Sequence, residues 1–353
     1  MGDSTDMTEA PDSPDALVSQ IRQVLACGSG SGVNAATALT ALVAQHLDDL
    51  PLPGGGNTLG RWRALAAVAA IDLSLAKLYE GHTDALAILR ELRAAEPQAK
   101  GTWCVWAAEA PQARVHITSA GLNIVHLSGT KSWCSGAATA DHALLTAWDA
   151  AADAPQLVSV HLRQPGVVVD SSPWKAVGMA GSASLDVHFD GATGQLVGDS
   201  GAYLQRPGFW QGGAGIAACW WGGAVGIGLA LKNSQASQPA SALSSFKLAA
   251  LGKVELALAE TAAVLREAAA WIDAHPAADA SRVVLTARLS AEQCAKRVLD
   301  EVGAAMGATP FCRDEKFAKA AADLPVFIRQ SHAERDCQAL GERISSGSHA
   351  WRL

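Results

Sequence analysis

The chain has 353 residues and a formal net charge of −7; 49% of its residues are hydrophobic and only 17% are charged. This length allows roughly two or three domains with a large buried core. The acidic balance and the absence of any run of Lys and Arg argue against a protein whose main role is to bind nucleic-acid phosphates.

The seven cysteines are scattered, and no Cys-x-x-Cys or Cys/His cluster has the spacing of a zinc site. Reduced thiols and no metal are therefore expected. Residues 1–13 are acidic and polar, unlike a signal peptide, and we expect a disordered tail there. The apolar stretch Phe209–Leu231 is interrupted by glycines and lacks a basic flank, which predicts a buried helix rather than a membrane span. These features favour a cytoplasmic protein without a membrane partner.

Three compositional zones predict the fold. Residues 14–100 repeat apolar side chains at steps of three and four, which indicates helices. Residues 101–205 change to a period of two, with Gly, Asp and Pro between short apolar runs, which predicts a compact antiparallel barrel or sandwich. In residues 206–353 helical patterns return, over Phe209–Lys232, Ala242–His275, Ser281–Met306 and Leu324–Ile344.

One stretch of the β-zone carries unusual residues. Gly129–Trp148, "GTKSWCSGAATADHALLTAW", is typical of two strands joined by a tight polar turn. Trp133, Cys134 and Ser135 stand at that turn, although a hairpin needs none of them. A planar group resting on the indole would explain their presence.

Four segments in this order resemble the acyl-CoA dehydrogenase superfamily across nearly the whole chain. The first is "GTKSWCSGAATADH", and the others are "WKAVGMAGSASLDVHFDG", "GFWQGGAGIAACWWGGAVGIGLAL" and "DEVGAAMGATPFCRDEKFAKAAADLPVFIRQSH". The resemblance implies an α+β multidomain fold with an N-terminal helical domain, a central antiparallel β-barrel and a C-terminal four-helix bundle. It also implies an FAD cofactor, a crevice between the β-domain and the bundle, and a homodimer or homotetramer.

The resemblance assigns the flavin site to the turn after the strand. Trp133 corresponds to the residue that covers one face of the isoalloxazine ring, and Ser135 to the one that bonds its redox-active edge, with the Cys134 peptide between them. This fits elementary chemistry, because an aromatic face holds a planar ring and donors at its nitrogen edge stabilise the reduced anion. The alternative is that Trp133 only caps the barrel core.

Other cofactor positions match the family less completely. Glu109 matches the Glu of the family's Thr-Glu-Pro string, but Ala108 stands where the flavin-bonding Thr belongs. The Gly-Ser-Asp loop of the family is absent. Gly303 and Gly307 fit the glycine loop that approaches the adenine half of the flavin, where the lack of a side chain permits close approach.

The catalytic base of the family is missing from its usual place. The resemblance places a carboxylate in a Tyr-Glu-Gly string, and the corresponding position here falls at Ser331 or His332. Glu255 and Glu260 lie on a predicted helix of the bundle and stay open as substitutes, although solvated surface carboxylates are the ordinary case.

His332 and Arg329 are the predicted catalytic residues. In a continuous helix Arg329, His332 and Asp336 share one face, where the imidazole could act as an acid or base near neutral pH. A salt-bridged helix surface is the alternative. An ending with His and without the dehydrogenase Glu resembles the flavin-dependent monooxygenase branch of the superfamily.

The resemblance leaves three functions open. The main expectation is an FAD-dependent oxidoreductase of the acyl-CoA dehydrogenase type, which oxidises a CH–CH bond of an acyl thioester or related small molecule with a non-classical base. Whether such an enzyme has an electron-transfer partner is left open. The alternatives are a flavin-dependent monooxygenase, and a degenerate relative that keeps the fold as a non-catalytic binding protein.

Overall fold

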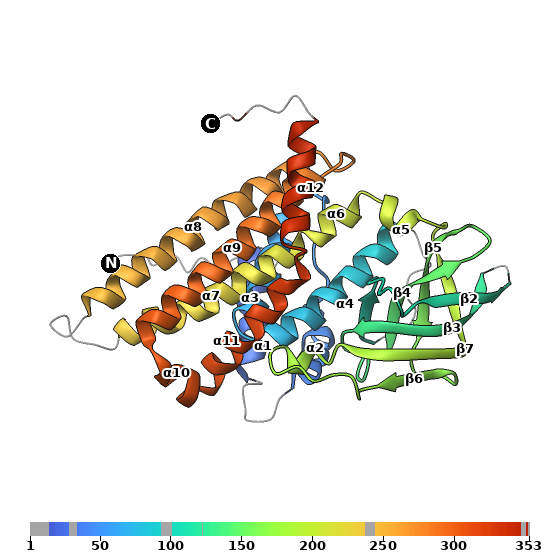
Figure 1. The fold of residues 1–353 in the computed structure, drawn as a ribbon, viewed down its shortest axis with the longest axis horizontal. Coiled ribbons are helices and arrows are strands. Elements are labelled where there is room, and N and C mark those ends of the chain that lie inside the picture. Colours follow the sequence, from blue (N-terminus) through green and yellow to red (C-terminus); the bar gives the residue numbers. More distant parts are fainter. Residues whose placement is uncertain are drawn as a thin grey trace, which may run out of the picture.

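The computed structural model describes residues 14–27, 34–92, 101–121, 123–236, 244–346 and 351. A β-barrel lies at one end of the molecule and the helices lie at the other (Figure 1). The order of helices, then strands, then helices confirms the predicted order of zones. The predicted acidic tail, residues 1–13, lies outside the described residues.

The last three of the four N-terminal helices begin at polar capping residues. The four helices are α1 (Pro14–Cys27), α2 (Ala35–Ala44), α3 (Thr58–Ala69) and α4 (Leu73–Glu91). The Asn57 side chain accepts a hydrogen bond from the amide of Gly60 at the start of α3, and that of Asp72 accepts one from Leu75 at the start of α4. Such caps satisfy amides that have no partner within the helix.

Seven strands form the β-domain: β1 (Trp103–Trp106), β2 (Val115–Ala120), β3 (Ile124–Cys134), β4 (His142–Asp149), β5 (Ala154–His161), β6 (Val167–Asp170) and β7 (Leu185–Val197). The pairings β4–β2, β2–β3, β3–β7, β7–β5 and β5–β4 close a ring, while β1 and β6 pair at its edges. The predicted barrel is therefore confirmed. The prediction of a purely antiparallel sheet is wrong, because β4 pairs in parallel with β1 and β2.

The two strands and the turn predicted within Gly129–Trp148 are present, as β3 and β4 with the turn between them, but the two strands are not neighbours in the sheet. Strand β2 pairs with both β3 and β4 and so lies between them. Gly129 lets β2 come close, since a Cβ there would lie 2.2 Å from the carbonyl oxygen of Arg114. The chain then leaves β3 at Trp133, whose φ of 65° turns it towards β4 on the other side of β2.

The C-terminal zone is helical. Its helices are α5 (Ala202–Gln205), α6 (Gly208–Gly213), α7 (Gly215–Ala236), α8 (Ser245–Ala274), α9 (Ser281–Met306), α10 (Ala308–Arg313), α11 (Glu315–Phe327) and α12 (Glu334–Ser345). The predicted helix Leu324–Ile344 is in fact two helices, separated by a 3₁₀ turn at Ile328–Gln330 and by Ala333 at a φ of 46°.

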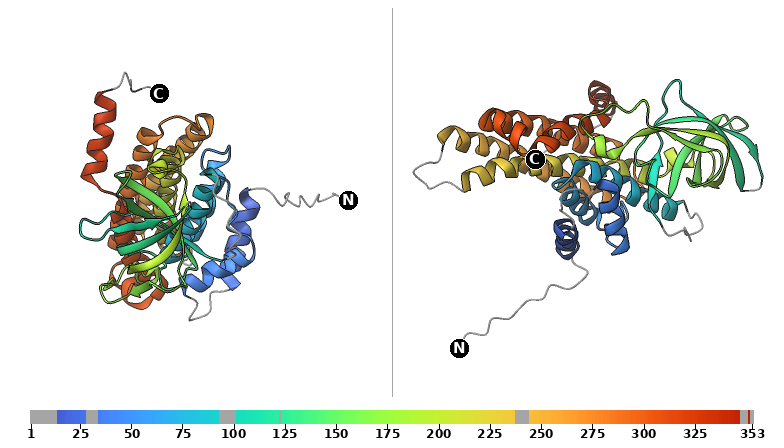
Figure 2. Two further views of the ribbon diagram at one scale, coloured as in Figure 1. Left: turned by 90° about the vertical axis from the view of Figure 1, so that its right-hand side faces the viewer. Right: turned by 90° about the horizontal axis from the view of Figure 1, so that it is seen from below.

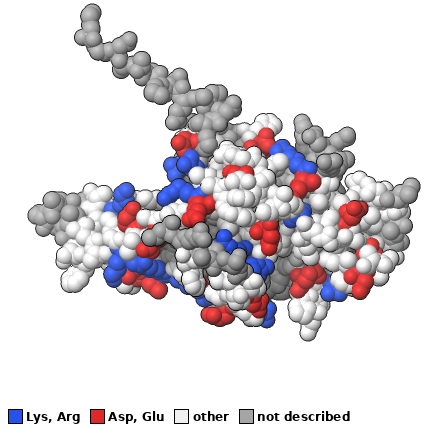
Figure 3. All heavy atoms as spheres, turned by 90° about the horizontal axis from the view of Figure 1, so that it is seen from above, with Lys and Arg blue, Asp and Glu red and all other residues white. Residues whose placement is uncertain are grey.

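The N-terminal and C-terminal helices share one apolar core that extends from Ile21 to Ile328. The barrel has its own core, and a smaller cluster joins α4 to the barrel. Because one core includes residues of both helical zones, the predicted domain limits at residues 14–100, 101–205 and 206–353 stay a prediction. Figure 2 shows α12 projecting at the edge of the helices, where Arg343 donates to the Ser281 hydroxyl of α9 at 2.6 Å. On the face in Figure 3 acidic and basic side chains are interspersed rather than gathered into a basic patch.

Helix α7 packs closely on α3 through glycines. A Cβ at Gly222 would lie 2.3 Å from the carbonyl oxygen of Ala66, and one at Gly226 would lie 2.6 Å from that of Ala70. The stretch Gly208–Ala236 is long and apolar enough to cross a membrane by composition, yet 72% of its most apolar window is buried inside the protein. The glycines therefore serve helix packing, and the predicted buried helix is confirmed.

Replacing Gly222 by Ala is expected to lower the free energy of unfolding by about 1–3 kcal/mol, because the new methyl group must displace the α3 backbone. The matched control is Gly252→Ala on α8, where a Cβ would meet no atom within 4 Å. There the substitution should raise stability by about 0.5–1 kcal/mol. Urea unfolding followed by circular dichroism measures both; equal stabilisation by the two variants would contradict the close approach of α7 and α3.

Candidate active site

A cavity of about 440 Å³ lies where the barrel, α4 and the C-terminal helices meet. Its barrel wall comes from the end of β1 and the end of β3. Its other walls come from α4, from α5 and α6, and from α9 together with the turn before α12. Its lining includes Lys77, Glu80, Gly81, Asp84, Trp106, Ala108, Trp133, Ser135, Arg206, Phe209, Trp210, Arg288, His332 and Asp336.

The barrel wall presents an aromatic face and a hydroxyl group. Trp133 is 63% exposed although it is a large apolar residue, and Ser135 lines the cavity beside it. The Ser135 hydroxyl lies 2.7 Å from that of Ser184, and the Ser135 carbonyl accepts a 3.1 Å hydrogen bond from the Trp106 indole. A planar group with a polar edge fits this wall, because the indole offers a stacking surface and the hydroxyl can donate to the edge. The residues present therefore fit a flavin ring.

Glu109 and Cys134, both predicted at the cofactor, hold the wall from behind. Neither lines the cavity. The Glu109 carboxylate lies 2.7 Å from the fully buried ammonium of Lys131, which also donates to the carbonyl and hydroxyl oxygens of Thr146. The buried Cys134 thiol bonds the carbonyl oxygen of Lys131 at 3.2 Å. These contacts tie the segment that carries Ala108 to the strand that carries Trp133.

Helix α4 lines the cavity with one polar face. Lys77, Glu80, Gly81 and Asp84 follow the spacing i, i+3, i+4, i+7, which brings them to one side of the helix. The Lys77 ammonium lies 2.9 Å from Glu80, and Asp84 lies 3.9 Å from the guanidinium of Arg61. Burial lowers the pKa of Lys77, but the charge of Glu80 and its hydrogen bond outweigh burial and leave that pKa raised. Burial and the Glu80 charge raise the pKa of Asp84.

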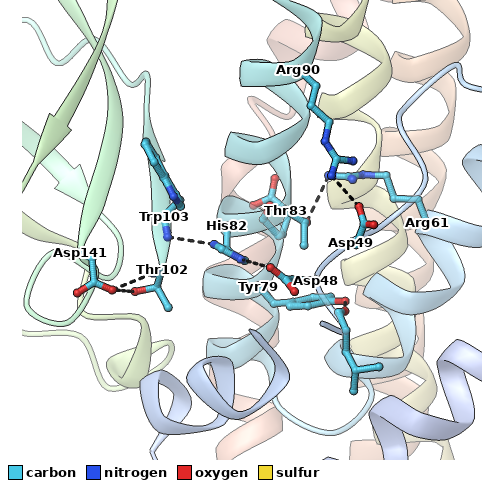
Figure 4. A network of polar contacts seen from close by, with 12 residues as sticks. Asp48, Asp49, Arg61, Tyr79, His82, Thr83, Arg90, Thr102, Trp103 and Asp141 are labelled. Atoms are coloured by element: carbon cyan, nitrogen blue, oxygen red, sulfur yellow. Dashed lines mark hydrogen bonds and ion pairs between the residues drawn. The ribbon is translucent and has the colours of Figure 1, made fainter. Parts of the chain in front are cut away.

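The opposite side of α4 is fixed by His82. Its side chain is buried, the Nδ1 atom accepts a 3.0 Å hydrogen bond from the amide of Trp103 on β1, and Nε2 lies 2.9 Å from the carboxylate of Asp48 (Figure 4). The nearby Tyr79 hydroxyl donates to the carbonyl oxygen of Leu47. These hydrogen bonds hold α4 against the loop between α2 and α3 and against β1 of the barrel. The position of α4 in turn sets the width of the cavity.

His332 faces the cavity from the turn between α11 and α12. Its Nδ1 atom lies 3.5 Å from the Asp336 carboxylate, which also accepts a hydrogen bond from the His332 amide. Arg329 is exposed on the 3₁₀ turn and does not line the cavity. The break in the helix at Ala333 removes the common face expected for Arg329, His332 and Asp336, but the contact between His332 and Asp336 is present.

Several other predicted residues lie away from the cavity. Gly303 and Gly307 stand at the far end of α9, with Gly303 about 22 Å along the helix from Arg288. Glu255 and Glu260 are exposed on α8, and Glu260 lies 3.6 Å from Arg297. Among the described residues no cluster of His, Cys, Asp or Glu could hold a metal ion.

The sequence analysis missed Lys77, Glu80, Asp84, Arg206 and Arg288. A signal for the first three was present, since their helical spacing marks a polar stripe on a helix that is otherwise mostly apolar. Arg288 gives no such signal, because an arginine on an amphipathic helix is ordinary. Its place in the cavity follows only from the packing of α9 beside the turn before α12.

Glu109→Gln is expected to lower the free energy of unfolding by about 1–3 kcal/mol, because it leaves the buried ammonium of Lys131 without a carboxylate. Lys131→Met removes that charge, so Glu109→Gln should cost much less in a Lys131→Met background. Denaturant unfolding of the wild type, both single variants and the double variant measures the coupling. If the changes in unfolding free energy of the two single variants simply add in the double variant, the interaction between Glu109 and Lys131 is contradicted.

No protein-family model matches the sequence, and a search of curated proteins finds no significant match. Solved structures do match. The FMN-bound form of TdsC, a dibenzothiophene monooxygenase from Paenibacillus sp. A11-2, has a TM-score of 0.79 at 19% identity over 93% of this chain and 96% of that chain. TdsC has also been solved with FMN and indole together.

Two further structures cover 96% of this chain at 16% identity. A nitrososynthase from Micromonospora carbonacea var. africana has a TM-score of 0.80 over 98% of its own chain, and the methanesulfinate monooxygenase MsuC from Pseudomonas fluorescens has 0.77 over 97%. Similarity at these identities shows the fold. The chain therefore has the fold of flavin monooxygenases built on the acyl-CoA dehydrogenase architecture, the superfamily that its sequence resembles.

Proposed function

We propose that this protein is a flavin-dependent monooxygenase that uses FMN and acts on a small molecule in the cavity between the barrel and the helices. The observation that carries the proposal is the arrangement of one cavity, with the exposed indole of Trp133 and the hydroxyl of Ser135 on the barrel wall and the paired His332 and Asp336 on the helical wall. Fold neighbours with FMN bound, TdsC among them, support FMN over the FAD expected from the sequence.

The dehydrogenase interpretation has less support. The family's dehydrogenases remove the α-proton with a carboxylate that is free to face the substrate. Of the carboxylates that line the cavity, Glu80 contacts Lys77, Asp336 contacts His332, and Asp84 lies near Arg61. The suggested substitutes Glu255 and Glu260 are exposed on α8. The fold neighbours named as monooxygenases point in the same direction.

Each wall has a distinct task in this mechanism. Trp133 would stack on a bound flavin ring, and the Ser135 hydroxyl would donate to the ring edge while Ser184, which also lies 3.1 Å from the Ser182 hydroxyl, orients it. When bound, reduced flavin would supply two electrons to O₂, so that one oxygen atom is transferred to the substrate and the other leaves as water. His332 can accept or donate a proton in the cavity, and the Asp336 carboxylate 3.5 Å from its Nδ1 atom orients the imidazole.

Titration of the full chain with FMN and with FAD tests the cofactor. We expect stoichiometric binding of FMN, and Trp133→Ala should weaken it about tenfold because a stacking face is lost. Trp351→Ala is the control, since Trp351 is 85% exposed and outside the cavity lining. A protein that binds neither flavin would favour the non-catalytic alternative.

Turnover with FMN, a flavin reductant and isotope-labelled O₂ tests the reaction, with indole as the first substrate. Labelled product should appear in the mass spectrum, and His332→Ala should slow its formation about 10²–10⁴-fold while FMN binding persists. The exposed neighbour Glu334→Gln should have no effect. Undiminished turnover in His332→Ala would end the assignment of His332, whereas anaerobic flavin reduction by an acyl-CoA would restore the dehydrogenase interpretation.

A further inference from the structure

Three Lys and Arg side chains line the cavity, and they differ in their partners. The Lys77 ammonium lies 2.9 Å from the Glu80 carboxylate, and the Arg206 guanidinium lies 2.6 Å from that of Glu91. Arg288 forms no ion pair within 4 Å among the described residues, although it lines the same cavity. Two of the three charges are therefore neutralised by direct contact, and that of Arg288 is not.

The guanidinium of Arg288 is fixed in place by neutral groups. Nη1 donates to the carbonyl oxygen of Gly213 at 3.2 Å, and Nη2 donates to that of Gln330 at 3.2 Å. The group also lies over the buried indole of Trp220, 5.3 Å from the ring centre. A guanidinium has five N–H donors in a planar fork, so donors remain for a ligand. Because the side chain is already ordered, a ligand would lose little binding free energy in fixing it.

The charge of Arg288 persists in this setting. Partial burial lowers its pKa, the carboxylates of Asp336, Glu80 and Glu292 act in the opposite direction, and arginine stays protonated at neutral pH. A partly buried cation without a contacting counter-ion carries a desolvation cost that an anionic ligand can offset.

The carboxylates of the same cavity oppose an anion only weakly. Glu80 is held by Lys77, and Asp336 is held by the amide and ring of His332. Asp84 lies 3.9 Å from the guanidinium of Arg61, and burial and the nearby Glu80 raise its pKa. The remaining lining is largely apolar and includes the aromatic rings of Trp106, Phe209 and Trp210 besides that of Trp133.

We infer that the substrate has an apolar, aromatic-sized body and one anionic group, a carboxylate or sulfinate, and that Arg288 binds this group. The inference deepens the proposed function and rests on it. Arg288 belongs to α9 and Trp133 to the barrel, so an anion held on α9 leaves the body of the substrate free to extend towards the barrel wall. A bidentate contact with the planar fork would fix both the position and the orientation of that group.

Calorimetric titration of the FMN-saturated full chain with indole-3-carboxylate and with indole tests this inference, because the two probes share a body and differ in charge. The carboxylate should bind about tenfold more tightly, and Arg288→Gln should abolish this preference. Arg288→Lys should retain part of it, since the charge remains and the fork is lost. Arg282→Gln, on the same helix but outside the cavity lining, should leave the preference unchanged.

Rising salt concentration provides a second measurement, on the wild type alone, in case Arg288→Gln fails to fold. It should weaken binding of the carboxylate and leave that of indole nearly unchanged. Equal affinities, a preference that survives in Arg288→Gln, or no carboxylate binding at millimolar concentrations would overturn the inference. FMN absorbance in the same samples separates the two proposals: FMN bound without a carboxylate preference contradicts only this inference, and a preference without FMN binding contradicts only the flavin function.

Discussion

The buried imidazole of His82 joins three separate parts of the chain at one point. Its Nδ1 atom accepts the Trp103 amide of β1, so the ring proton belongs on Nε2, where Asp48 accepts it at 2.9 Å (Figure 4). At 1% exposure the residue has no water to replace either partner. Both hydrogen bonds must therefore persist in the folded protein, and they fix α4 against the barrel and against the loop before α3 at the same time.

The fixed position of α4 determines which side chains its cavity-facing side can carry. A fixed helix can carry a polar stripe into a confined cavity, because each charge can be given a partner in advance. Lys77 and Glu80 neutralise one another, and Arg61 reaches Asp84 from α3. A shift of α4 by an ångström would lengthen these contacts and leave buried charges unpaired, which is costly. The two hydrogen bonds of His82 and the ion pairs on the opposite face of α4 therefore depend on each other.

The parts of the site that could be predicted from the sequence are those encoded locally. Trp133 and Ser135 belong to one short motif, and the structure brings both to the cavity. The parallel pairing of β1 with β4 depends on contacts distant in sequence, so alternation alone could not reveal it. The helix break at Ala333 has no Gly or Pro to signal it; its φ of 46° accompanies local hydrogen bonds from the Ala333 amide to Ser331 and from the His332 amide to Asp336.

The same break determines how His332 is presented. The Ser331 hydroxyl accepts the Ala333 amide at 3.1 Å, and Asp336 accepts the His332 amide at 3.3 Å, so the turn is held by its own side chains. The result is a backbone that presents His332 to the cavity with a carboxylate beside it. An ionised carboxylate at neutral pH can accept a proton but has none to give, whereas an imidazole can do either. The turn thus presents to the cavity a side chain that can either accept or donate a proton.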